Sequence, residues 1–245
     1  MTKKKRSCLF CGNTDLSNEH IFAQWLQDEL NIRKVRMGLQ HMTFLGQQIS
    51  ERQLTPNTLV NGLICKLCNN GWMSLIESDV KALLLALLKQ PTTNLSTLLK
   101  EDHLVLAKWT FKTAIILNHA SNYRNIVPRR HFRHFYQHKR IPENVTVLMG
   151  FTKETEKIDW VQSQGVMHTG DASISSNPRF EDIYKITIQL DHLLLKVIYS
   201  PFYEYNYVFD QDDHVMIHPN LWAPNSFKIA ENFHSFDIKG SLYST

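Results

Sequence analysis

Four cysteines arranged in two short pairs constrain this chain more than any other feature. Cys8 and Cys11 form one Cys-x-x-Cys pair, Cys65 and Cys68 form the second, and the 245 residues hold no further cysteine. Two such pairs supply the four thiolates of a closed tetrahedral site, so the sequence predicts a structural zinc ion. The alternatives are a thioredoxin-like redox pair or two unrelated pairs. Nothing near Cys8 has the strand and helix pattern of a redox motif.

Composition indicates the compartment and limits the partners. Residues 3–6 are basic, but no apolar segment follows them, so the start of the chain does not have the pattern of a secretory signal. The apolar run at 83–88 is too short to cross a bilayer. We therefore expect a cytoplasmic protein with no membrane partner and with reduced thiols. The formal net charge of +4 permits a polyanionic partner without requiring one, and the basic tail is expected to add nonspecific attraction to nucleic acid.

The spacing of apolar residues predicts an α+β fold. Residues 1–90 form the zinc-containing unit, in which a short helix is predicted over 21–30 and a strand over 59–64. A helix is expected from about Asn69 onward, stopped by Pro91. The segment between the first helix and the strand is expected to be irregular or hairpin-like.

The second part of the chain, residues 91–245, is expected to be helical and then β-rich. It begins with a turn-rich linker over 91–96, followed by a buried helix over 101–119 and a basic helix over 128–140. The predicted strands cover residues 145–151, 160–167, 184–190, 193–199 and 205–209.

An acid–histidine pair lies between the two cysteine pairs. Glu19 and His20 precede the second pair, and Asn69 follows that pair directly. The order Cys-x-x-Cys, acid-His, Cys-x-x-Cys-Asn resembles the HNH endonucleases, also called ββα-metal nucleases, and in particular their zinc-braced four-cysteine subgroup. The resemblance covers residues 1 to about 80, and the string from Asn69 to Glu77 is similar to a bacterial branch of the family.

The sequence departs from the family pattern at several positions. The family usually has Asp where this chain has Glu19, and Pro where it has Ala23. Many members have His in place of Asn69 and a further His on the same helix. The Asn form occurs in the zinc-braced subgroup, so we interpret this chain as a variant of the pattern.

The resemblance implies a ββα-metal module that hydrolyses phosphodiester bonds, in DNA, and leaves 5′-phosphate ends. His20 would activate water, and Glu19 and Asn69 would hold a catalytic Mg²⁺ or Mn²⁺. The asparagine that orients the backbone loop of the histidine would be Asn57 or Asn61, and we choose Asn61 because it lies on the second strand just before the cysteine pair. Histidine titrates near pH 6.5, and hard oxygen ligands suit Mg²⁺ and Mn²⁺. Free-standing proteins of this family occur in bacterial phage-defence systems, which is the context that the resemblance suggests.

A basic and aromatic segment follows Pro128. Its aromatic residues at 132, 135 and 136 would face the core of a helix, and the basic side chains would contact phosphates. A solvated helix face explains the pattern equally well. The candidate nucleic-acid-binding residues are Arg129, Arg130, Arg133, Lys139 and Arg140. The rival functions are a zinc-stabilised module that binds nucleic acid without cutting it, and an assembly subunit whose C-terminal region binds a protein partner.

Overall fold

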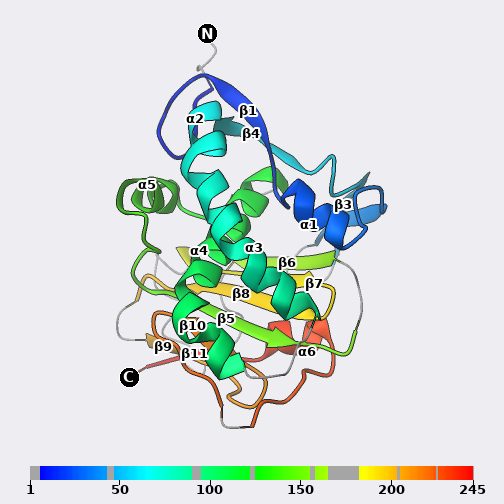
Figure 1. The fold of residues 1–245 in the computed structure, drawn as a ribbon, viewed down its shortest axis with the longest axis vertical. Coiled ribbons are helices and arrows are strands. Elements are labelled where there is room, and N and C mark those ends of the chain that lie inside the picture. Colours follow the sequence, from blue (N-terminus) through cyan, green and yellow to red (C-terminus); the bar gives the residue numbers. More distant parts are fainter. Residues whose placement is uncertain are drawn as a thin grey trace.

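The computed structural model combines helices with several antiparallel sheets, the largest of which has five strands (Figure 1). It describes residues 6–42, 47–89, 95–121, 125–154, 158–164, 182–202, 205–224 and 226–244. Lys3, Lys4 and Lys5 of the basic tail and most of the predicted linker at 91–96 lie outside the described residues. Among the described helices, none combines the length and apolar character that a bilayer crossing requires.

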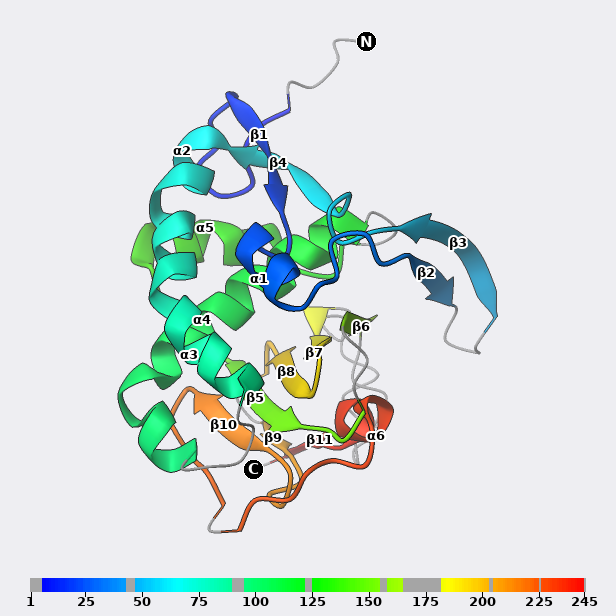
Figure 2. The same cartoon turned by 45° about the vertical axis from the view of Figure 1, so that its right-hand side comes forward.

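The N-terminal part is built on two strands that are far apart in sequence. Strand β1 (Leu16–His20) pairs antiparallel with β4 (Val60–Cys65). The chain between them forms α1 (Gln24–Glu29) and a hairpin of β2 (Met37–Met42) and β3 (Gln48–Leu54). The hairpin projects away from the rest of the protein (Figure 2), and six of the seven residues of β3 are exposed. Of the two alternatives expected for this segment, irregular or hairpin-like, the pairing of β2 with β3 favours the second.

The helical segment after β4 has three parts instead of the single helix predicted from Asn69. A short turn, α2 (Lys66–Cys68), leads into a π-helical turn, η1 (Asn69–Met73), and then into α3 (Ser74–Lys89). The first turn begins early because Cys65 Sγ accepts a hydrogen bond from the Cys68 amide. Gly71, inside η1, has non-helical backbone angles and marks a kink in this helical segment. Asn69 therefore lies in a turn upstream of α3 and not at the first turn of a regular helix.

The C-terminal part is a five-stranded antiparallel sheet with helices on both faces. Helix α4 (Leu95–Ser121) is longer than the predicted 101–119 and packs against β5, β7, β8 and β10. The strand order is β10-β5-β8-β7-β6. The strands are β5 (Val145–Phe151), β6 (Ile158–Gln164), β7 (Tyr184–Leu190), β8 (Leu193–Tyr199) and β10 (Val215–His218).

The central strand β8 is buried on both faces. Leu193, Leu195 and Val197 belong to the large core that includes α4, whereas Leu194 packs on the other face with Phe236 of α6 (Phe233–Ile238). Figure 2 shows α3 and α4 on one side of the sheet and α6 on the other. Period-two alternation places consecutive side chains of a strand on opposite faces, which explains why β8 has a continuous apolar run. Strands β9 (Tyr205–Val208) and β11 (Ser241–Ser244) form a separate pair.

One hydrophobic cluster connects the two parts of the chain. It extends from Cys8 through α3 and α4 to Ile217 in the sheet. Helix α5 (Arg129–His138) joins it through Phe132 and Phe135, with Pro128 at the N-cap. The predicted domain boundary near residue 90 falls within residues 90–94, outside the described residues, so the division into two domains stays a prediction.

Candidate metal centre and catalytic site

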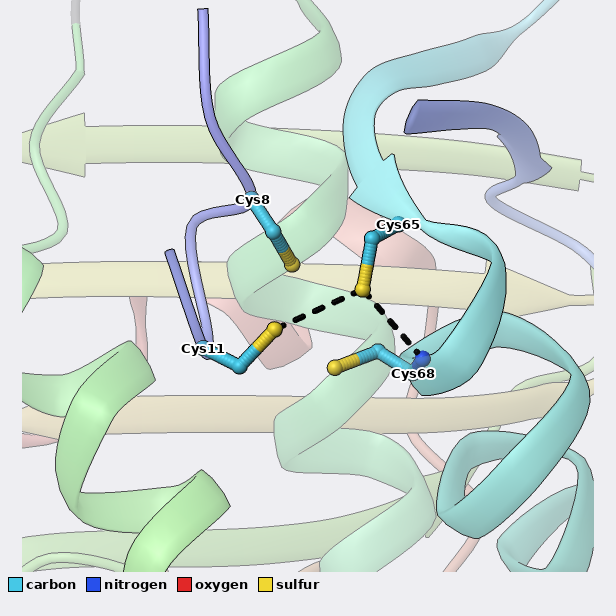
Figure 3. A group of neighbouring side chains, drawn as sticks. All are labelled: Cys8, Cys11, Cys65 and Cys68. Atoms are coloured by element: carbon cyan, nitrogen blue, oxygen red, sulfur yellow. Dashed lines mark hydrogen bonds between the residues drawn. The ribbon is translucent and has the colours of Figure 1, made fainter. Parts of the chain in front are cut away.

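The four cysteines converge at one point, here called the four-cysteine cluster (Figure 3). The sulfur atoms of Cys8, Cys11, Cys65 and Cys68 all lie within 4.8 Å of one another, and Cys11 Sγ lies 3.4 Å from Cys65 Sγ. A tetrahedral zinc ion with bonds of about 2.3 Å would hold its sulfurs about 3.8 Å apart. The four thiols therefore have the number, the chemistry and the spacing of a structural zinc site, as the sequence predicts.

Backbone contacts fix the four-cysteine cluster to the end of the β1–β4 pair. The Leu9 amide donates to Leu63 O at 3.0 Å, and the Lys66 amide donates to Asp15 O at 3.0 Å. The ring of Phe10, between the first two cysteines, contacts the ring of Trp72 edge to face at a centroid distance of 5.0 Å. A cation held here would join the start of β1 to the turn that follows β4.

Burial and the hydrogen bonds within the cluster shift the pKa values of Cys8 and Cys65 in opposite directions. The hydrogen bond with Cys68 lowers the pKa of Cys8 to about 4, and burial raises the pKa of Cys65. A divalent cation binds thiolates and would displace the protons that remain on the cluster.

Glu19 is a buried acid on the strand that leaves the four-cysteine cluster. It is 8% exposed and lies opposite Asn61 in the β1–β4 pair, and its carboxylate forms no hydrogen bond or ion pair with any described residue. Burial raises its pKa to about 7, with the Lys112 ammonium opposing the shift and the Glu77 carboxylate adding to it. A buried carboxylate without a partner is costly when ionised, and a bound cation would remove that cost.

His20 is the next residue on β1 and is partly buried. Its Nε2 lies 3.3 Å from Nε2 of the Gln24 side chain, and its Nδ1 is buried without a partner among the described residues. Burial lowers the pKa of His20, and the Arg33 guanidinium lowers it further. The imidazole is therefore neutral at pH 7, which is the form that accepts a proton.

The two asparagines differ in what their amides contact. Asn69 Nδ2 donates to Ser17 Oγ at 3.2 Å, which ties the turn after β4 to β1 and leaves Oδ1 without a described donor. Asn61 is buried: its Nδ2 donates to Ile116 O at 3.2 Å, and its Oδ1 accepts from the Leu63 amide at 2.9 Å. These contacts join β4 to α4, and the predicted role of Asn61 toward the histidine loop stays a prediction.

The structure brings the predicted site residues to one pair of strands without joining them directly. Glu19 and His20 are consecutive on β1, and Asn69 reaches the same strand through Ser17. Within the described part of the chain, no hydrogen bond links Glu19, His20 and Asn69 to one another.

A buried ion pair near Glu19 was not among the predicted site residues. Lys112 on α4 is fully buried and pairs with Oε1 of Glu77 on α3, which also accepts a hydrogen bond from Trp109 Nε1 at 2.9 Å. The other carboxylate oxygen of Glu77, Oε2, is buried and has no partner among the described residues. The sequence contains the residues of this pair, but only the packing of α3 on α4 brings them together.

Helix α5 presents a basic surface beside the four-cysteine cluster. Five basic residues on and just after this helix, here called the α5 basic face, are all exposed, whereas Phe132 and Phe135 point into the core, as predicted. Arg130 bonds to Asp182 Oδ2 at 3.1 Å and to Tyr199 Oη at 3.0 Å. The α5 basic face consists of Arg129, Arg130, Arg133, Lys139 and Arg140.

A groove separates α5 from the first cysteine pair. It has a volume of about 380 Å³ and is lined by residues 7–12 together with Arg129, Arg133, Tyr136 and Gln137, none of which carries a carboxyl group. Lys139 Nζ lies 4.1 Å from the ring centroid of Tyr136, which lines the groove, and 4.6 Å from that of Trp72. The groove therefore presents positive charge and hydrogen-bond donors, which suits an anionic ligand.

The buried carboxylate has a direct consequence for stability. Because the pKa of Glu19 is raised from 4.5 to about 7, its contribution to stability is full below pH 4.5 and is lost as pH rises through 7. At pH 8 and without Mg²⁺ or Mn²⁺, the ionised group costs on the order of 3 kcal/mol. Glu19→Gln is therefore expected to raise the melting temperature by roughly 5–10 °C at pH 8 and to change it little at pH 4.

Thermal unfolding followed by circular dichroism checks this expectation. Glu231→Gln, at an exposed position, is the matched control and should leave the melting temperature unchanged at both pH values. A Glu19→Gln protein that melts below the wild type at pH 8 would show that the carboxylate has a stabilising partner.

Comparisons with protein-family models, with curated proteins and with solved structures find no match for this chain. The function of the site must therefore be inferred from the chemistry and the arrangement of its own residues.

Proposed function

We propose that this protein is a metal-dependent endonuclease of the HNH type that hydrolyses phosphodiester bonds in DNA. The observation that carries the proposal is Glu19, a carboxylate that is 8% exposed and has no partner among the described residues. Beside it, His20 has an unpartnered buried Nδ1. Unsatisfied buried polar groups are rare and costly, and they are most readily explained where a ligand or cation completes the site.

The residues of β1 and of the turn after β4 would have different roles in the reaction. His20 is neutral at pH 7 and would accept the proton of the attacking water. Glu19 and Oδ1 of Asn69 would hold the Mg²⁺ or Mn²⁺, which supplies charge stabilisation for the phosphate in the transition state and for the leaving oxygen. The four-cysteine cluster would hold zinc in a closed site and act only by keeping β1 and the turn after β4 together.

The α5 basic face supports a polyanionic substrate. Arg129 and Arg133 line the groove beside the four-cysteine cluster, where a phosphate backbone would meet no carboxylate. Contacts of this kind position nucleic acid without reading its sequence, and their strength falls with salt.

The proposal is tested by incubating the zinc-loaded protein with supercoiled plasmid and either Mg²⁺ or Mn²⁺. We expect conversion to nicked or linear DNA only when one of these cations is added. The control omits the cation and avoids chelators, because a chelator would also remove zinc. Supercoiled DNA that survives with both cations between pH 6 and 9, together with a band shift in a gel, would contradict catalysis and support a binding protein without nuclease activity.

A further inference from the structure

The Glu77–Lys112 pair lies close to the strand pair that carries Glu19. Asn61, which faces Glu19 across the β1–β4 pair, donates to Ile116 O on α4, and Lys112 is one turn earlier on the same helix. Lys112 in turn holds Glu77 of α3. Helix α4 therefore contacts Asn61 on β4, opposite Glu19, and also carries Lys112 of the buried ion pair.

The charges in this buried region do not balance. Glu19 and Glu77 contribute two negative charges when ionised, and Lys112 contributes one positive charge. The Lys112 ammonium pairs with Oε1 of Glu77. Oε2 of Glu77 and the carboxylate of Glu19 have no partner among the described residues. When both carboxyl groups are ionised, this region is short of one positive charge, and carboxylate oxygens without a described partner lie on two different elements, β1 and α3. A buried charge persists in proteins when it is paired or when it binds a metal.

We propose that Glu77 is the second carboxylate of the cation site and that Lys112 is a positioning residue, which would hold Glu77 through Oε1 and leave Oε2 available to a cation. This inference rests on the proposed function and adds a named group to its metal site. Trp109 and Lys112 belong to the same helix and both donate to Oε1, so the two donors act on one oxygen and leave the other free. Mg²⁺ and Mn²⁺ typically use one or two carboxylates and keep several waters, which matches a site in which Glu19 and Glu77 supply the carboxylates beside Asn69.

A double substitution separates this role from a purely structural ion pair. Glu77→Gln with Lys112→Met removes both charges together and leaves neither partner as an unpaired buried ion, so we expect the double variant to fold. Its affinity for Mn²⁺ should fall about tenfold or more, as is usual when groups around a metal site are removed. Mn²⁺ binding is measured by electron paramagnetic resonance of the free ion, with the full-length zinc-loaded protein. The matched control is Asp212→Asn with Lys228→Met, an exposed pair remote in sequence, which should bind Mn²⁺ like the wild type.

Glu77→Gln alone provides a second readout, because its amide oxygen can still accept from Trp109 and Lys112. We expect its plasmid cleavage to need about tenfold more Mn²⁺ and to recover at high Mn²⁺, which a folding defect would not do. A double variant that binds Mn²⁺ as tightly as the wild type, or a wild type that binds none, would overturn the inference. A wild type that binds Mn²⁺ through Glu77 and yet leaves plasmid intact would contradict only the proposed nuclease function.

Discussion

Cys65→Ser is expected to release zinc and to unfold the N-terminal part of the protein. Cys65 is fully buried, its sulfur lies 3.4 Å from that of Cys11, and it accepts the hydrogen bond that starts α2. Structural zinc sites contribute about 10–16 kcal/mol of apparent binding free energy in small zinc-dependent folds, which is comparable with the whole stability of a domain. We expect a loss of several kcal/mol and a fall in melting temperature of more than about 10 °C.

Zinc content by atomic absorption and unfolding by circular dichroism measure the two effects separately. Leu67→Ser is the matched control, because Leu67 lies between the second pair of cysteines, is 73% exposed and offers no thiol. It should keep one zinc per chain and should melt like the wild type. If Cys65→Ser kept its zinc and its melting temperature, the four-cysteine cluster would not be a structural zinc site.

The features that the sequence could predict are those set by local spacing. Two Cys-x-x-Cys pairs predict a four-sulfur cluster because they supply the ligand number of a closed zinc site, and the structure confirms the cluster. Strands β5, β7 and β8 have the bounds predicted from their apolar runs. Among the short elements, β4 and β9 are predicted to within one residue at each end, whereas the sequence analysis does not identify β10, α6 and β11.

The features that the sequence could not predict depend on contacts between distant segments. Glu77 and Lys112 are 35 residues apart, and their pairing follows from the packing of α3 on α4. The burial of Glu19 has a similar origin, because β4, the strand that pairs with β1, lies against α4. The early helical turn before Asn69 follows from the Cys65 sulfur acting as its cap, a role that spacing alone does not reveal.

His20→Ala should reduce metal-dependent cleavage by a factor of about 10²–10⁴ while leaving zinc content unchanged. A general base contributes about this much to a rate when it accepts the proton of the attacking water. The side chain is only partly buried, and its one described polar contact is with Gln24, so its loss should cost little stability. Plasmid nicking rates at saturating Mn²⁺ measure the effect.

The control for this variant is His234→Ala, which removes an exposed imidazole from α6, on the opposite face of the large sheet from α4. It should cleave at the wild-type rate. Because His20→Ala keeps Glu19, Asn69 and the four-cysteine cluster, Mn²⁺ binding should persist in the variant, so a lost rate would report proton transfer and not a lost cation. A His20→Ala protein as fast as the wild type would show that another group activates the water, and the unpartnered Nδ1 of His20 would then need a different explanation.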